Sequence, residues 1–260
     1  MTTRPRPRLL VSALTGLAAL CLLATGCTPG TDDELAPAPT RTITATPSQS
    51  VAPAPATVPV GKGAVSPSDV VWAQGSVLHV GQRQVDLGAV DVDALAVVPG
   101  GVFVLAGGEL WFTDLRRLRG TAQTQVTQLR VSRGADRLAV TDTRSGRPLV
   151  QGYDTRTGRA VRGAVHTLTP QQLRAGPGRF EVRTGATGTS VIESATRRRV
   201  PVAGLPAAFE LGGWTGASAF YGLSGTGATR AVIACDVVRH RCTRQGAATG
   251  SGPVVFGTGL

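Results

Sequence analysis

The chain has 260 residues with 27 basic and 16 acidic side chains, and its formal net charge is +11. Its N-terminal apolar run, 9–24, is about 16 residues long, short of the roughly 20 that cross a bilayer as a helix. All basic residues except Lys62 are arginine, so part of the charge follows from biased composition. The rest of the positive charge favours binding to anionic lipid headgroups, wall polymers or an acidic partner.

The N-terminus has the pattern of an export signal. Arginines at 4, 6 and 8 precede the apolar run, which ends in LATGC. Ala24, Thr25, Gly26 and Cys27 resemble a bacterial lipobox, although that motif prefers leucine where Ala24 stands. The resemblance implies a lipoprotein signal peptide at 1–26, cleavage after Gly26, and diacylglycerol and palmitate on Cys27. The alternative is a secreted protein in which Cys27 is a free thiol.

Residues 27–65 are rich in proline, threonine and alanine and contain no aromatic residue. Such a segment buries too little apolar surface to offset its ordering entropy. We therefore expect a disordered tether over 27–65, leading to one extracytoplasmic domain over 66–260.

The domain sequence is typical of an all-β protein. Short apolar runs rich in β-branched residues alternate with turns of Gly, Asp, Ser and Thr, and no sustained helical period appears. One segment, 169–176, has some helical character, but we interpret it as a loop.

A repeat indicates the architecture. Segments 109–120, 149–163 and 231–246 each contain an apolar strand, an aspartate, a polar turn and a basic strand. The three aspartates are Asp114, Asp154 and Asp236, which we expect to form Asx-type turns. A degraded fourth copy covers 179–202, and the inner strands of the four units are expected to begin near 94, 128, 179 and 209.

These units predict a small β-propeller of about five short four-stranded blades. The segment from Asp69 to Leu87 supplies three strands, and 253–257 supplies one strand without a blade. We expect the two to share a sheet, which would close the ring and leave no open edge. The competing hypothesis is a two-sheet sandwich.

The lipobox, the tether and the aspartate-turn repeats together resemble uncharacterised actinobacterial lipoproteins with WD40-like or TolB-like propellers. The resemblance covers 69–257, and the WD dipeptide is absent: Thr113, Tyr153 and Cys235 precede the three aspartates. It implies a propeller fold and no particular activity.

Two cysteines, Cys235 and Cys242, remain in the exported domain. If Val238 and Arg239 form a two-residue turn, the cysteines lie opposite each other on antiparallel strands, at a separation that suits a disulfide. We therefore predict a disulfide. A metal site with His240 or a redox pair fits the spacing less well.

No catalytic, metal-binding or cofactor-binding set emerges from the sequence. The three histidines, His79, His166 and His240, are isolated from one another, and the three tryptophans are expected in the core. The run Arg197–Arg199 is interpreted as a solvated edge strand. The acidic residues outside the turns, in no obvious pairs, are Asp86, Asp91, Asp93, Glu109, Asp136, Asp142, Glu181, Glu193 and Glu210.

The sequence thus predicts a binding or scaffold domain held on the outer face of the cell membrane by the Cys27 acyl anchor. The expected partners are the lipid bilayer and an envelope protein or anionic wall polymer, with no nucleic acid, no metal and no cofactor. The alternatives are a propeller-type hydrolase or lactonase and a glycan-binding protein. Three acidic residues converging on the ring axis would favour the enzyme.

Overall fold

The computed structural model describes residues 56–260 apart from 64, 89, 251 and 260. The predicted signal peptide, its cleavage site and Cys27 lie outside this range. The described residues form mostly β-strands, which confirms the predicted all-β class. Within them, no helix is long and apolar enough to cross a membrane.

The largest sheet has eight strands in the order β3-β2-β1-β19-β4-β5-β6-β7. These strands are β1 (Val71–Gln74), β2 (Val77–Val80), β3 (Arg83–Asp86), β4 (Ala94–Val98), β5 (Gly101–Ala106), β6 (Glu109–Thr113), β7 (Leu118–Gly120) and β19 (Val254–Thr258). The last strand, β19, pairs antiparallel with β1, placing Trp72 opposite Phe256. The C-terminal strand and the strands of 69–87 therefore share a sheet, as the sequence predicts. On its other edge β19 pairs parallel with β4.

Three smaller sheets follow in chain order. The second, ordered β11-β10-β9-β8, comprises β8 (Val126–Val131), β9 (Arg137–Asp142), β10 (Leu149–Asp154) and β11 (Ala160–Val161). The third comprises β12 (Phe180–Gly185), β13 (Gly188–Glu193) and β14 (Arg199–Val200). The fourth comprises β15 (Phe209–Trp214), β16 (Ala219–Ser224), β17 (Ala231–Asp236) and β18 (Arg241–Ala247), with the short 3-10 helix η1 (Gly227–Thr229) between β16 and β17.

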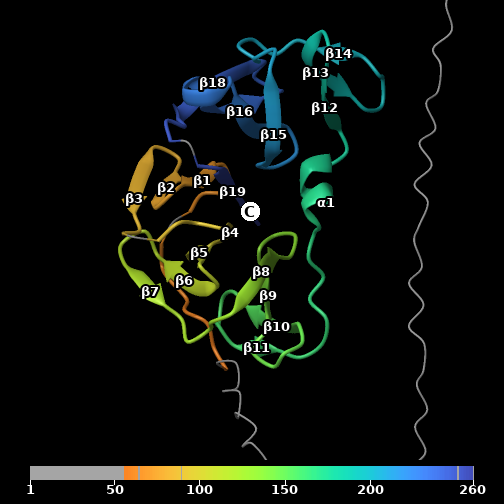
Figure 1. The fold of residues 1–260 in the computed structure, drawn as a ribbon. Coiled ribbons are helices and arrows are strands. Elements are labelled where there is room, and N and C mark those ends of the chain that lie inside the picture. The colour runs from red at the N-terminus through yellow and green to blue at the C-terminus, as the bar shows by residue number, and fades with distance from the viewer. Residues whose placement is uncertain (1–55, 64, 89, 251, 260) are drawn as a thin grey trace, which may run out of the picture. The chain divides into compact units, whose positions relative to one another are not determined.

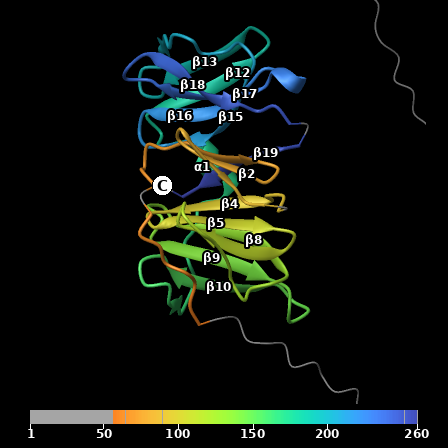
Figure 2. The ribbon, with the colours of Figure 1, turned by 90° about the vertical axis from the view of Figure 1, so that its left-hand side faces the viewer.

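The predicted starts of the inner strands are close to the observed ones. Strands β4 and β15 begin at Ala94 and Phe209 as expected, β8 begins two residues early, and β12 begins one residue late. The degraded fourth repeat forms three strands rather than four. Of the run Arg197–Arg199, which was predicted as an edge strand, only Arg199 lies on the edge strand β14, and the other two arginines precede it. Figure 1 shows the sheets following one another in chain order, with β19 near the middle. Figure 2 shows them as successive layers, from β9 and β10 through β4 and β5 to β15 and β16.

A second correction concerns the segment 169–176. It contains a helix, α1 (Pro170–Ala175), rather than the predicted loop. The Thr169 side chain accepts a hydrogen bond from the Gln172 amide, and the Gln172 side chain accepts one from the Thr169 amide. This reciprocal capping box, followed by proline at the first helical position, gives a six-residue segment enough local stability to form a helix.

A third correction concerns the boundary between tether and domain. Val58 is buried in an apolar cluster, and its amide donates to the carbonyl of Gly158 at 2.6 Å. The amide of Gly63 donates to Gly100 at 3.3 Å. Because this stretch buries apolar surface and pairs its backbone, the packed domain begins before residue 66.

Four apolar clusters hold the sheets together. One lies between β4–β6 and β8–β10, and a second between β1–β2 and β4–β5. A third joins β12–β13 to β15–β17, and the fourth joins β1 to β16 and β17 around Trp72 and Tyr221. Between the sheet β8–β11 and the sheet β12–β14, no cluster forms among the described residues, and α1 stands between them (Figure 1).

Candidate ligand cavity

A cavity of about 510 Å³ opens where several inner strands end. Its lining comes from β1, β4, β15, β16 and β19, from the segment that follows β8, and from α1. Cavities of roughly 300–1,000 Å³ are the usual size for small-molecule sites. The cavity is therefore large enough for a ligand, and it is built from parts of the chain that are far apart in sequence.

Glycines allow β15 to reach the edge of this cavity. Strand β15 has a bulge between Leu211 and Gly213. A Cβ atom on Gly212 would lie 2.6 Å from the Phe256 ring, and one on Gly213 would lie 2.5 Å from the Tyr221 hydroxyl. Any side chain at either position would push β15 away from β16 and β19. The two glycines are therefore required by the close approach of three strands.

Tyr221 joins the last sheet to β19 at the wall of the cavity. Its hydroxyl donates a 2.9 Å hydrogen bond to the carbonyl of Gly257, and its ring centroid lies 5.1 Å from that of Phe256. Burial raises the pKa of Tyr221 to about 12. The phenol is consequently neutral at physiological pH, so it serves as a hydrogen-bond donor and is a poor candidate for a general base.

Helix α1 forms one wall of the cavity and is attached mainly through Trp214. The indole Nε1 of Trp214 donates to the carbonyl of Arg174 at 3.0 Å. Gly176 is so close to the indole that a Cβ there would lie 2.5 Å from a ring carbon. No residue of α1 is buried. The helix is therefore held by a few contacts on one side chain and not by a core of its own.

The prediction that the three tryptophans lie in the core is confirmed in part. Trp72 is 1% exposed, and its ring stacks on His79 with centroids 3.6 Å apart. Trp111 is partly buried and packs against the cluster formed by β1–β6. Trp214 is half-buried and lines the cavity. The sequence alone did not distinguish this third position, because all three residues occur in similar strand patterns.

The polar side chains of the lining are few. Asp69 contributes a carboxylate to the cavity lining, and this group accepts a 3.0 Å hydrogen bond from the Ser66 amide. Arg133 and Gln172 add a positive charge and an amide. None of the nine acidic residues singled out in the sequence lies in the lining. Asp142, for example, pairs with Arg144 at 2.9 Å, and Glu181 pairs with Arg183 at 2.8 Å. In the described part of the chain, no group of three or more metal-ligating side chains forms.

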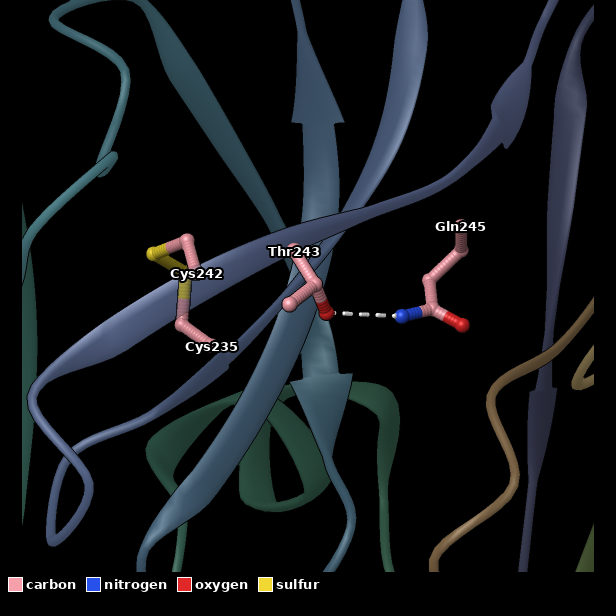
Figure 3. Close-up of a disulfide and its surroundings, with 4 residues drawn as sticks. All are labelled: Cys235, Cys242, Thr243 and Gln245. Atoms are coloured by element: carbon pink, nitrogen blue, oxygen red, sulfur yellow. Dashed lines mark hydrogen bonds between the residues drawn. A yellow bond between two sulfur atoms is a disulfide. The ribbon is translucent and has the colours of Figure 1, made fainter.

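The two cysteines of the domain form the predicted disulfide on the β17–β18 hairpin (Figure 3). Cys235 lies opposite Cys242 and Asp236 lies opposite Arg241, so the predicted register is present. The His240 ring nitrogen Nδ1 lies 2.9 Å from the carbonyl of Pro201. With both sulfurs in a disulfide and the imidazole bonded to the backbone, the hairpin holds a covalent staple and not a metal site.

The three repeat aspartates form turns as predicted. Asp114 accepts from the amides of residues 116 and 117, Asp154 from those of 156 and 157, and Asp236 from those of 238 and 239. Backbone donors, the amide of Arg117 first, lower the pKa of Asp114. The amide of Thr157 does the same for the pKa of Asp154. Asp114 and Asp154 therefore stay ionised. All three aspartates stabilise turns outside the cavity lining.

Comparisons with known proteins give no family. No family model matches the chain, and no curated protein matches it either. Among solved structures, a chain of a nidogen/laminin complex matches at 12% identity and TM-score 0.31, covering 73% of this chain and 97% of that one.

A putative TolB from Agrobacterium tumefaciens matches at 11% identity and TM-score 0.26, covering 68% of this chain and 69% of that one. TolB from Acinetobacter baumannii matches at 12% identity and TM-score 0.26, and the match covers 70% of this chain and 49% of that one, about half its length. The assignment of the fold therefore rests on the strand order and register of the chain itself.

Proposed function

We propose that this chain is a membrane-anchored lipoprotein of a bacterial envelope. Its domain is a five-bladed β-propeller that binds a ligand or partner at the central cavity. In this proposal β19 completes the blade of β1–β3, and β4–β7, β8–β11, β12–β14 and β15–β18 supply the other four. The strand pairing of β19 with β1 and the order of the sheets support the closed ring. The lipobox residues Ala24–Cys27 support the anchor and an extracytoplasmic location, and the arginine-rich composition is typical of an actinobacterial source.

The observation that carries the binding function is the cavity. Glycines 212, 213 and 257 bring three strands to its wall, and Trp214, Leu168 and Leu173 give it apolar surface beside a few polar groups. Sites that bind small molecules combine an apolar lining with a small number of placed polar groups. A ligand with a compact apolar face and polar edges fits this lining better than a strongly charged polymer does.

The cavity is tested by filling it. Ala217 is exposed and lies in the lining, whereas Ala195 is exposed on a turn of the third sheet, away from the cavity. Wild-type protein and the variants A217W and A195W would be incubated with the low-mass fraction of the bacterial envelope and examined by native mass spectrometry. We expect a bound mass on wild type and A195W, and at least tenfold less on A217W. Equal occupancy in A217W would place binding elsewhere.

The anchor has a separate test. Cys27→Ser removes the thiol that would carry the lipid, so we expect the protein to move from the membrane pellet to the soluble fraction. Retention of the variant in the pellet would contradict lipid attachment at Cys27. This result is independent of the cavity experiment, so the two parts of the proposal fail separately.

Glycan binding is the second candidate, and the placement of Trp214 favours it. Indole faces stack well on sugar rings, but Gly176 covers part of this indole and Phe220 lies 5.3 Å from it. A glycan would therefore contact the remaining edge of the ring. Binding of envelope oligosaccharides that is lost in W214A and kept in W214F would support the glycan. Hydrolysis of a lactone or glycoside that D69N abolishes would instead favour an enzyme.

A further inference from the structure

The lining of the cavity carries a positive charge at Arg133, on the turn between β8 and β9. Among the described residues of the lining, Arg133 is the only basic side chain, and it is exposed. Its guanidinium forms no ion pair and no side-chain hydrogen bond with any described residue. The N–H donors of this group are therefore available to a ligand.

The turn that carries Arg133 is held in place by hydrogen bonds. The amide of Ser132 donates to the carbonyl of Arg137 at 2.9 Å, and the amide of Ala135 donates to the carbonyl of Ser132 at 3.0 Å. Ala135 is buried in the cluster between β4–β6 and β8–β10, and its carbonyl accepts a 2.6 Å hydrogen bond from the Thr155 hydroxyl. Because the backbone is fixed before a ligand arrives, binding at Arg133 orders a single side chain and costs little entropy.

Gln172 on α1 adds a second donor to the lining. Its side-chain oxygen Oε1 already accepts a 2.8 Å hydrogen bond from the Thr169 amide in the capping box of the helix. The amide nitrogen Nε2 has no hydrogen-bond partner among the described residues. Gln172 therefore offers a ligand N–H donors, as Arg133 does, and a carboxylate can accept from both kinds of group.

Asp69 limits the charge of the ligand. It is the only acidic side chain among the described residues of the lining, and its Oδ2 accepts from the Ser66 amide at 3.0 Å. A carboxylate in the same cavity repels a ligand that carries several negative charges. The lining therefore favours a ligand with one acidic group.

The rest of the ligand faces apolar side chains. Leu168 and Leu173 are partly buried in the lining, and Val97 is 4% exposed. Trp214 uses its indole N–H on the carbonyl of Arg174, so it offers a ligand its ring. A small inorganic anion would leave this apolar surface in contact with water, whereas an organic body would cover it.

We propose that the cavity binds a compact organic anion, with one carboxylate or similar acidic group on an apolar body, and that Arg133 pairs with the acidic group. The planar guanidinium matches the geometry of a carboxylate and can donate two parallel hydrogen bonds to it. This inference rests on the ligand-binding function proposed for the cavity, and it adds the chemical class of the ligand.

Two dyes of the same shape test the role of the charge. Anilinonaphthalene sulfonate carries one negative charge, and phenylnaphthylamine is its uncharged parent. Fluorescence titrations would use the full chain with Cys27→Ser, which needs no detergent. We expect the sulfonate to bind more tightly than its parent. Arg133→Gln should weaken the sulfonate roughly tenfold, since a hydrogen bond to a charged group has about that effect, and should leave the parent unchanged.

Arg147→Gln is the matched control. Arg147 is exposed on the next turn of the same sheet, outside the lining, and forms no ion pair with a described residue. R147Q changes the net charge of the chain as R133Q does, and it should leave the affinity for both dyes unchanged. Equal weakening of the sulfonate by R133Q and R147Q would overturn the pairing, because the effect would then come from the overall charge.

A217W separates this inference from the function on which it rests. If A217W weakens both dyes while R133Q weakens neither, the cavity binds ligands but Arg133 does not select an anion. If A217W changes neither dye, the dyes bind elsewhere, and the proposed function fails as well. The failure of either dye to bind the wild-type cavity would also overturn the inference.

Competition then identifies the source of the anion. Naphthoate represents a compact aromatic acid, and dodecanoate represents the acyl chain of a lipid. Displacement of the sulfonate by either compound, lost in R133Q, supports a carboxylate at Arg133, and the stronger competitor indicates the natural source. Displacement by neither compound would overturn the proposal.

Discussion

The two faces of the sheet β8–β11 differ sharply. The face toward β4–β6 buries Leu129, Leu138 and Val140 in a continuous apolar cluster. The pairing register puts Arg130, Thr141 and Val150 on the opposite face, where Val150 is 62% exposed. One face therefore packs against the neighbouring sheet through an apolar cluster, which we call a sealed junction. The other face has no such cluster among the described residues, and α1 lies between it and the next sheet.

The sheet on the far side of that junction repeats the pattern. Its face toward β15–β17 contributes Phe180 and Val191 to an apolar cluster. The register puts Glu181 and Arg183 on the other face, where the two side chains pair with each other at 2.8 Å. Exposed ion pairs contribute little stability, so the junction spanned by α1 is expected to open more readily than the four sealed ones.

The largest effect should separate the two faces of the sheet β8–β11. Val140→Ala removes two methylene equivalents from a side chain that is 1% exposed, and we expect a loss of about 2 kcal/mol in the free energy of unfolding. Val150→Ala makes the same chemical change on the exposed face and should alter it by less than about 0.5 kcal/mol. Urea denaturation of both variants measures the difference. Equal losses would mean that Val150 also packs in a sealed junction.

A smaller effect should appear at α1. Gly176 and Gly178 both have positive φ, so alanine at either position strains the backbone by roughly 1–3 kcal/mol, and Gly176, at φ 71° and ψ −173°, lies in a region that is essentially restricted to glycine. Only at Gly176 does the new Cβ meet Trp214; at Gly178 nothing lies within 4 Å. We expect G176A to be less stable than G178A by about 1 kcal/mol, because the new Cβ would disrupt the hydrogen bond of Trp214 and a typical hydrogen bond contributes about that much. Faster amide exchange confined to α1 in G176A would locate the loss.

The sealed junctions were the more predictable part of the molecule. Asp114, Asp154 and Asp236 marked their turns because an aspartate that accepts two amides is a local device, visible within a few residues. The Cys235–Cys242 pair followed from counting outward from one hairpin turn. Local signals of this kind fix strand boundaries and register, and through them most of the fold.

The cavity was not predictable in the same way. Gly212 and Gly213 look like ordinary turn residues in sequence. Only the approach of Phe256 from another sheet, and of the Tyr221 side chain from the neighbouring strand β16, explains them. Helix α1 was misassigned because six residues show no apolar period. Its capping pair, Thr169 and Gln172, was the available signal. Features that depend on contacts between distant sheets leave little trace in a single sequence.

The smallest expected effect is a loss of folding stability at low pH, at the sealed junction around Trp72. His79 on β2 stacks on Trp72, which packs in the cluster joining β1 to β16 and β17, and burial lowers the pKa of His79 below its ordinary value of 6.5. The unfolded chain then binds a proton at higher pH than the folded chain does. The stabilisation is complete above pH 6.5 and declines as the pH falls from 6.5 toward the lower folded-state pKa.

His79→Phe keeps an aromatic ring against Trp72 and cannot titrate in this range. Wild type should therefore lose stability relative to H79F between pH 7.5 and 5.5, a difference that cancels contributions from carboxylates common to both proteins. Paired urea denaturation series measure it. Parallel pH profiles would mean that the imidazole titrates alike in the folded and unfolded chains, and that its burial against Trp72 contributes nothing to the pH dependence of stability.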